Sequence, residues 1–253
     1  MSAKIDSTKE FVSGVYAKME KNLAVVRKRL GRPLTLTEKI VLGHRIPAGG
    51  GMEDGLTVLD LLAHHPSTAR FISLKLARRF VADHPPSSIV NKAAEAFRQS
   101  DGDIPTVLRT IFEAPEFFAP DAFQAKVKMP LEYVASALRA TGAEVQMSHQ
   151  LLRYLGRMGE PLFLAQPPTG YPDIGSSWTS PDMLLTRMNF ASDLVANRIP
   201  GSRLSPESVG DRESFARLVA PDALSPATRS ALSQTEGSQF IALLMAAPEF
   251  QRR

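Results

Sequence analysis

Hydrophobic residues recur every three or four positions along most of the chain, which is the spacing of amphipathic α-helices. Proline and glycine interrupt this pattern at short intervals, and strand-like alternation is scarce. The pattern therefore predicts an all-α fold, an irregular orthogonal helical bundle with one long loop rich in proline and glycine. The predicted helices cover residues 8–30, 36–42, 56–63, 68–82, 88–99, 104–113, 131–141, 150–159, 182–197, 214–219, 227–234 and 238–247, and residues 122–127 are a further candidate.

Two local signals indicate where helices begin and end. Ser67 follows a proline and is predicted to cap helix 68–82. The tetrapeptide Ala-Pro-Glu-Phe closes two hydrophobic segments, at residues 114–117 and 247–250. Each copy predicts a helix that stops before the proline, followed by a phenylalanine that folds back onto the core.

The long loop covers residues 161–181 and contains five prolines, two glycines and the only tryptophan of the chain. Long irregular segments in compact domains are often functional. The candidate ligand-binding residues are Gln166, Tyr171, Asp173 and Trp178 of the loop, with Arg187 and Asn189 of the next helix. Flat rings beside polar groups suit a sugar or an extended peptide. The alternative is a structural strap whose rings fill the core and whose carbonyl groups are bound by the next helix.

Composition limits the chemistry that the chain can perform. Hydrophobic residues make up 43% and charged residues 22%, as in ordinary globular proteins. Cysteine is absent, which excludes disulfides, thiolate zinc sites and cysteine-held iron–sulfur clusters. No hydrophobic run reaches the length of a membrane span. We predict no cofactor and no metal site, because the histidines lack the spacing of metal ligands.

Positive charge is concentrated near the N-terminus, where residues 1–45 hold ten Lys and Arg against four Asp and Glu. The nearest aromatics, Phe11 and Tyr16, lie at helix-core spacing, so we predict a solvated helix end and no binding of nucleic acid. The glycines at 49–51 match no known phosphate-binding motif. Arg78 and Arg79 form a weak candidate anion-binding pair, with pairing to acidic residues of a neighbouring helix as the alternative.

Most of the chain resembles the bacterial domain-of-unknown-function family 1800. The matching stretches are GHRIPAGGGMEDGLTVLDLLAHHPSTARFISLKLARRFV, SDGDIPTVLRTIFEAPEF, KVKMPLEYVASALRATGA, QPPTGYPDIGSSW, LLTRMNFA and PEFQRR, which follow the family's order over residues 43–253. The resemblance implies an exported protein of about twice this length with no established activity. No export signal is visible on this chain, which as written predicts a cytoplasmic location.

Residues 15–44, VYAKMEKNLAVVRKRLGRPLTLTEKIVLGH, resemble the N-terminal segment of aconitase. Aconitase activity is not expected, because the family holds its cluster through cysteines. The two resemblances meet at Gly43 and His44. We therefore expect two parts, residues 1–44 and residues 45–253, with weak packing between them.

Three functional hypotheses remain open at this stage. The leading one is a non-catalytic binding or assembly module that uses the 161–178 loop surface, with a glycan, a peptide or the family's N-terminal half as partner. The second is part of an enzyme that acts on exported polymers and shares its catalytic groups with that half. The third is a truncated or recombined product without independent function.

Overall fold

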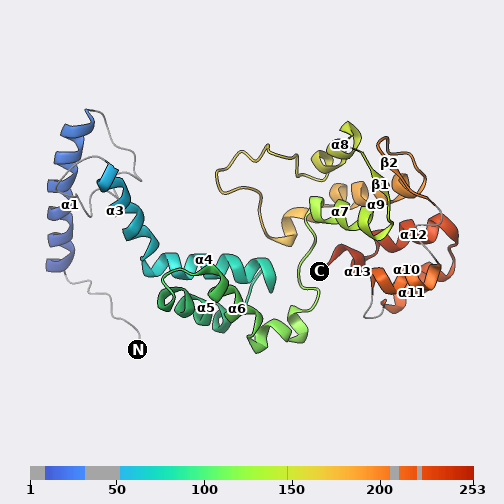
Figure 1. The fold of residues 1–253 in the computed structure, drawn as a ribbon, viewed down its shortest axis with the longest axis horizontal. Helices are drawn as coiled ribbons and strands as arrows, with labels where there is room; N and C mark the ends of the chain where they lie inside the picture. Colours follow the sequence, from blue (N-terminus) through green and yellow to red (C-terminus); the bar gives the residue numbers. More distant parts are fainter. Residues whose placement is uncertain (1–8, 32–51, 147, 206–210, 221–223) are drawn as a thin grey trace.

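The chain is almost entirely helical (Figure 1). The computed structural model describes residues 9–31, 52–146, 148–205, 211–220 and 224–253. These residues form twelve α-helices and one antiparallel pair of two-residue strands, so the predicted all-α class is confirmed. The helices are α1 Lys9–Leu30, α3 Met52–Ala63, α4 Pro66–Phe80, α5 Ser87–Gln99, α6 Ile104–Phe112, α7 Pro130–Ala140, α8 His149–Arg157, α9 Pro181–Val195, α10 Arg212–Val219, α11 Pro226–Ser233, α12 Gly237–Ala246 and α13 Pro248–Gln251. Short 3₁₀-helices are η1 Pro115–Phe118, η2 Pro120–Ala122 and η3 Gly175–Trp178.

Proline marks the start of many of these helices. It occupies the first or second position of α4, α6, α7, α9, α11 and α13. An N–H group at these positions has no partner within the helix, so proline loses no hydrogen bond there and its fixed φ favours the first turn. Side-chain oxygens accept hydrogen bonds from free N–H groups at five helix starts, and they belong to Asp103, Ser148, Ser180, Asp211 and Ser225.

Two local predictions are wrong. The N-cap of α4 is His65 and not Ser67, because Pro66 takes the first helical position. Residues 123–127 are not a helix but a turn followed by an extended segment, in which Val127 pairs antiparallel with Arg252. Arg252 is far from Val127 along the chain, so the local hydrophobic pattern does not indicate that they pair. The predicted helix 36–42 lies outside the described residues.

Helices α4, α5 and α6 form a unit with its own core, called here the central unit. Its core side chains are small or β-branched, which lets the three helices approach closely. They are Ala77, Val81, Ile89, Val90, Ala93, Val107, Ile111 and Ala114. The first Ala-Pro-Glu-Phe segment ends α6 as predicted, and Phe117 returns to pack against this core.

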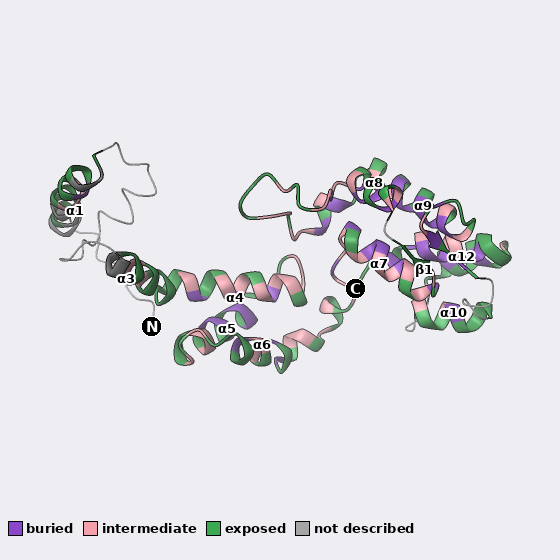
Figure 2. Cartoon of the chain, turned by 45° about the horizontal axis from the view of Figure 1, so that its top comes forward, coloured by how far each residue is buried: buried purple, intermediate pink, exposed green. Residues whose placement is uncertain are grey.

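Helices α7 to α13 form the C-terminal unit, and buried residues gather around α9 and α12 (Figure 2). Aromatic rings organise its main core. Tyr133 makes edge-to-face contacts with Phe190 and Phe250, at centroid distances of 5.9 and 5.7 Å. Phe250 belongs to the second Ala-Pro-Glu-Phe segment and is buried, as predicted. A smaller core joins α10, α11 and α12 through Phe215, Leu232, Phe240 and Leu244.

The two strands, β1 Glu144–Val145 and β2 Ser202–Arg203, tie the start of α8 to the end of α9. Glu144 pairs with Arg203 and Val145 with Ser202. Gly201 precedes β2 with φ +84°, and a Cβ atom there would lie 2.8 Å from the carbonyl oxygen of Gln146. Only glycine fits this close backbone approach.

The C-terminal segment is joined to residues 126–128 by backbone hydrogen bonds. Lys128 N donates to the Gln251 carbonyl at 2.8 Å, and Arg253 N donates to the Lys126 carbonyl at 2.9 Å. This pairing brings residues from the middle and the end of the sequence together at the boundary between the central and C-terminal units.

Arg187 of α9 lies completely buried behind that pairing. Its Nη1 donates to Oε1 of Gln251 and its Nη2 to the Lys128 carbonyl, both at 2.8 Å. The guanidinium also lies 5.0 Å from the ring centroid of Tyr133, whose hydroxyl donates to the Arg187 carbonyl at 3.0 Å. One side chain thus joins three segments that are distant in sequence.

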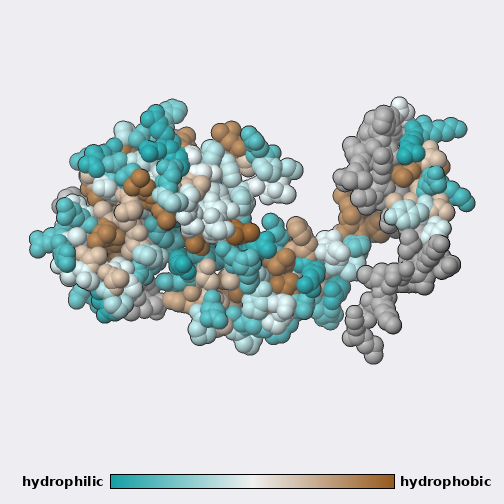
Figure 3. Space-filling model, turned by 180° about the vertical axis from the view of Figure 1, so that it is seen from behind, coloured by the Kyte–Doolittle hydropathy of each residue, from teal (hydrophilic) through white to brown (hydrophobic). Residues whose placement is uncertain are grey.

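Helices α1 and α3 lie at one end of the structure (Figure 1). The described side chains of α3 include no buried one, and hydrophobic atoms lie on the surface over α3 (Figure 3). Its exposed leucines are Leu56, Leu59 and Leu62. The boundary expected at residue 44 falls outside the described residues, so the division into residues 1–44 and 45–253 stays a prediction.

Replacing Arg187 with methionine should destabilise the C-terminal unit. The change keeps most of the side-chain volume but leaves Gln251 and the Lys128 carbonyl without their buried donors. We expect the free energy of unfolding to fall by about 2–4 kcal/mol, measured by urea denaturation followed through tryptophan fluorescence.

The matched control is Arg198→Met. The Arg198 side chain is 62% exposed and pairs with Asp193, so its loss should cost less than about 1 kcal/mol. An equal cost for both variants would contradict the structural role of Arg187.

Candidate functional site

The long loop between α8 and α9 projects from the body of the C-terminal unit (Figure 1). It divides into two limbs, called here the outer limb (residues 161–170) and the inner limb (residues 171–178). Most residues of the outer limb are exposed, whereas the inner limb ends in η3 and packs against the protein. The limbs therefore have different physical roles.

The aromatic rings of the inner limb close the loop on itself. Trp178 is only 3% exposed, and its Nε1–H donates to the Pro172 carbonyl at 3.0 Å. The Tyr171 hydroxyl donates to the Pro161 carbonyl, and the two rings meet edge to face with centroids 6.1 Å apart. In this conformation Trp178 presents no free ring face to a ligand.

A buried ammonium group anchors the inner limb. Lys126 Nζ lies 2.6 Å from Oδ1 of Asp83 and 3.2 Å from Oδ1 of Asp173, and it also donates to the Asp173 carbonyl at 3.0 Å. The other oxygen of Asp83 accepts a hydrogen bond from Gly175 N at 2.7 Å. Asp83 follows α4, so this cluster joins the central unit to the loop. We call it the Lys126 junction.

The hydrogen bonds of the junction lower the pKa of the Asp83 carboxyl. Partial burial raises the pKa of its carboxyl, but the hydrogen bonds from Lys126 and Gly175 outweigh that effect and hold the pKa below its usual value. A Cβ atom on Gly175 would lie 2.9 Å from Val127 Cγ2 and 3.1 Å from Oδ2 of Asp83. The close approach of the loop backbone therefore requires glycine at this position.

The predicted anion-binding arginines lie beside this junction, and both have partners within the chain. Arg78 Nε donates to the Asp83 carbonyl at 3.1 Å. Arg79 pairs with Glu132 and lies 3.7 Å from Asp173. These contacts correspond to the pairing alternative, although the acid on a neighbouring helix is Glu132 of α7.

Further charged side chains extend the junction over α7 and the C-terminus. Arg253 Nε donates to Oε2 of Glu132 at 3.1 Å. Lys128 Nζ lies 4.0 Å from the ring centroid of Phe250, and burial, helped by the nearby Arg187 and Arg253, lowers the pKa of Lys128 to about 8. Six cationic side chains thus lie in or beside the junction, and they are Arg78, Arg79, Lys126, Lys128, Arg187 and Arg253.

The remaining predicted site residues do not gather with the aromatic rings. Gln166 is exposed on the outer limb and Asn189 is exposed on α9. Arg187 binds the Lys128 carbonyl and Gln251 rather than the loop carbonyls proposed for it, because it occupies the face of α9 that meets Tyr133. The structure thus brings together Tyr171, Trp178 and Asp173, with Arg79 beside them.

The outer limb carries a feature that the sequence reasoning missed. Phe163 is 100% exposed, with φ +61°, and Leu164 is 68% exposed. The stretch 161–172 contains no charged residue. Large hydrophobic side chains on a projecting loop are the usual mark of an interaction surface. In the sequence, the run Leu162-Phe163-Leu164 before two prolines was the signal that could have identified this surface.

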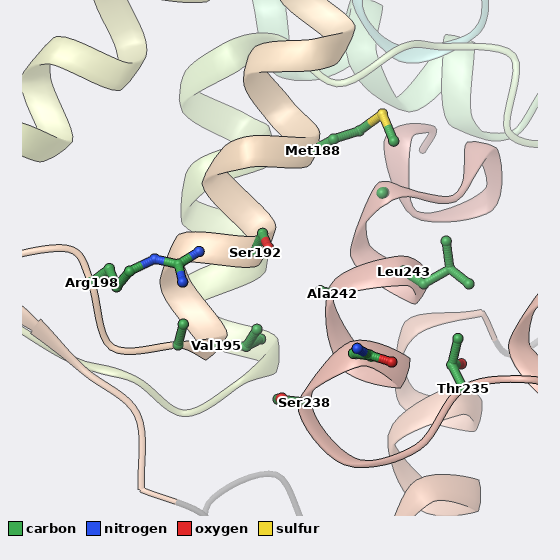
Figure 4. Close-up of a pocket in the computed structure, with 11 residues that line it drawn as sticks. Met188, Ser192, Val195, Arg198, Thr235, Ser238, Ala242 and Leu243 are labelled. Atoms are coloured by element: carbon green, nitrogen blue, oxygen red, sulfur yellow. The ribbon is translucent and has the colours of Figure 1, made fainter.

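A groove of about 440 Å³ runs between α9 and α12 (Figure 4). Met188, Val195 and Leu243 supply hydrophobic walls, while Ser192 and Ser238 add hydroxyl groups to the lining. Arg198 also lines it, but Nε and Nη2 of its guanidinium already contact Asp193 at 2.8 and 2.7 Å. The groove is an open surface feature without a buried polar group directed into it.

Two negative findings apply to the described residues. Among them, no group of three His, Asp or Glu side chains is arranged to hold a metal ion. His44, one of the histidines considered in the sequence, lies outside the described part of the chain. None of the described helices combines the length and the hydrophobicity that crossing a membrane requires.

A family model for a protein of unknown function, DUF1800, matches residues 14–252. The chain belongs to the DUF1800 family. The recognition made from the sequence is confirmed, and the match starts well before residue 43. It includes residues 15–44, so it does not set that segment apart, and the aconitase resemblance stays a prediction. No solved structure matches this DUF1800 chain.

The stretches that carried the DUF1800 resemblance also supply most of the Lys126 junction and its surroundings. These residues are Arg78 and Arg79 of FISLKLARRFV, Lys126, Lys128 and Glu132 of KVKMPLEYV, Asp173, Gly175 and Trp178 of QPPTGYPDIGSSW, Arg187 of LLTRMNFA, and Gln251 and Arg253 of PEFQRR. The recognisable motifs of the DUF1800 domain therefore meet in space, where they hold its two units and its loop together.

Replacing Lys126 with methionine should open the junction. The Lys126 side chain is 4% exposed, and its loss leaves two facing carboxylates without their shared cation. We expect the free energy of unfolding to fall by about 3 kcal/mol, measured by urea denaturation. Lys92→Met is the control, because Lys92 forms an exposed pair with Glu116 that should contribute less than about 1 kcal/mol.

Acid should weaken the same junction. The folded-state pKa of Asp83 lies below its unfolded value, so its contribution to stability is complete above the unfolded pKa and is lost as pH falls through the folded pKa. We expect stability to drop between neutral pH and about pH 3, with a smaller drop in Asp83→Asn. Identical pH profiles for the two proteins would show that Asp83 is not responsible.

Proposed function

We propose that this DUF1800 chain is a non-catalytic binding module that presents the outer limb of its long loop to a partner protein. The observation that supports this most is the exposure of Phe163 and Leu164 on an uncharged, proline-rich segment. Such side chains gain free energy when a partner removes them from water, at roughly 25 cal/mol per Å² of hydrophobic surface.

The chemistry of the exposed side chains favours a protein partner over a glycan. Sugar recognition uses flat aromatic faces next to hydrogen-bonding groups, and Trp178 is buried while the Tyr171 hydroxyl is bonded within the loop. Leucine, phenylalanine and consecutive prolines instead match hydrophobic grooves that receive extended peptide segments. The partner surface is therefore expected to be hydrophobic and uncharged.

The anchoring of the inner limb supports this proposal physically. Asp173 and Gly175 fix one end of the loop through Lys126 and Asp83, Trp178 ties that end to Pro172 of the loop itself, and α8 fixes the other end. Restricting the loop before binding reduces the conformational entropy lost in the complex. The sequence offered a structural strap and a binding surface as alternatives. In this proposal the inner limb is the strap and the outer limb is the binding surface.

Photo-crosslinking in the native host tests the proposed surface. A chain with Phe163→p-benzoylphenylalanine should yield a covalent adduct with one protein, identified by mass spectrometry. Adding Leu164→Ser should reduce the yield about tenfold or more, because interaction energy concentrates in a few large side chains.

The control places the same photoreactive residue at position 118. Phe118 of η1 is 74% exposed but lies outside the loop. Adducts of equal yield from both positions, or no adduct from position 163, would overturn the proposal.

A further inference from the structure

Two adjacent histidines connect α3 to α4. Helix α3 ends at Ala63 and α4 begins at Pro66, so His64 and His65 form the whole connection. Both rings make hydrogen bonds in the structure. His64 contacts oxygen atoms, whereas His65 contacts a backbone N–H group. The identity of each partner fixes which ring nitrogen carries a proton.

His64 uses both ring nitrogens to contact oxygen atoms. Nδ1 lies 2.8 Å from the Asp60 carbonyl, and Nε2 lies 2.7 Å from Oδ1 of Asp101. A carbonyl or an ionised carboxylate can only accept a hydrogen bond, so both nitrogens must donate. The geometry therefore corresponds to the doubly protonated, positively charged imidazolium. Through Asp101, it joins the end of α3 to the turn between α5 and α6.

His65 has the opposite requirement. Its Nδ1 accepts a hydrogen bond from the backbone N–H of Ser67 at 3.1 Å, which caps the N-terminus of α4. Accepting that bond requires a free lone pair on Nδ1, so the capping ring must be neutral. Protonation of His65 would remove the cap and place a positive charge at the positive end of the helix dipole.

We propose that the His64–His65 connection is a pH-sensitive joint, in which His64 holds α3 to the central unit when its ring is protonated, while His65 caps α4. Rising pH releases the contact of α3 with the α5–α6 turn.

The surroundings of the joint set the direction of the His64 response. The hydrogen bond to the Asp60 carbonyl and that to Asp101 raise the pKa of His64 above its ordinary value, with added attraction from both carboxylates. The contribution of the contact is therefore complete at low pH and is lost as pH rises through the raised pKa. Arg98 of α5 lines the same cavity and is paired with Glu95.

Among the residues that the structure describes, few other interactions hold this end of α3. The Thr68 hydroxyl donates to the Leu62 carbonyl at 2.6 Å, and none of the α3 side chains whose burial is described is buried. A cavity of about 420 Å³ lies beside the joint, lined by Ala63, Ala69 and Phe97. The His64–Asp101 contact is thus a substantial part of the attachment, even though exposed ion pairs are individually weak.

Proton NMR of the full chain tests the proposal. The imidazole resonances of His64 should titrate above those of an unperturbed histidine, and Asp101→Asn should lower the midpoint. Hydrogen-exchange protection of the last turn of α3, corrected for intrinsic exchange rates, should fall about two- to fivefold as pH rises through that midpoint.

His64→Gln should abolish this pH dependence, whereas His149→Gln, at the exposed first position of α8, should leave it intact. A His64 midpoint unchanged by Asp101→Asn, or α3 protection with the same pH profile in His64→Gln, would overturn the proposal.

Discussion

The contact between one ammonium group and two carboxylates determines how the parts of this molecule fit together. Lys126 meets Asp83 from the end of α4 and Asp173 from the inner limb of the loop, while its own backbone pairs with Arg253. A buried ion is costly to remove from water, so the site exists only when all its partners are in place. This requirement defines how the helices of the central and C-terminal units are arranged relative to each other.

Much of the fold could be predicted from local sequence, because helices depend on local signals. The hydrophobic spacing placed α4 to α7, α9 and α12 close to their observed positions, and the two Ala-Pro-Glu-Phe segments end helices and return a phenylalanine as expected. The two errors have different causes. The N-cap of α4 shifted because Pro66 takes the first helical position. Residues 123–127 are extended because Arg252 pairs with Val127, and such long-range partners cannot be read from a local pattern.

The candidate site was less predictable for the same reason. Tyr171, Trp178 and Asp173 were correctly singled out as unusual, but whether a ring faces solvent depends on what lies over it. Trp178 is covered by its own loop, and Arg187 faces Tyr133 rather than the loop. The exposed pair Phe163 and Leu164 was overlooked because hydrophobic residues are normally assigned to the core. Their position on a projecting limb became evident only in three dimensions.

The pairing of residues 126–128 with residues 251–253 also has a consequence for biosynthesis. The central unit uses contacts that are short along the chain, so it can fold while later residues are still being synthesised. The backbone pairing beside the Lys126 junction cannot form in this way, because Gln251 and Arg253 supply the partners of Lys128 and Lys126. Until they leave the ribosome, Arg187 lacks one hydrogen-bond acceptor and the Lys126 backbone lacks its pairing partner. The two units therefore join only after residues 251–253 have been synthesised, and the surfaces that meet there stay uncovered until then.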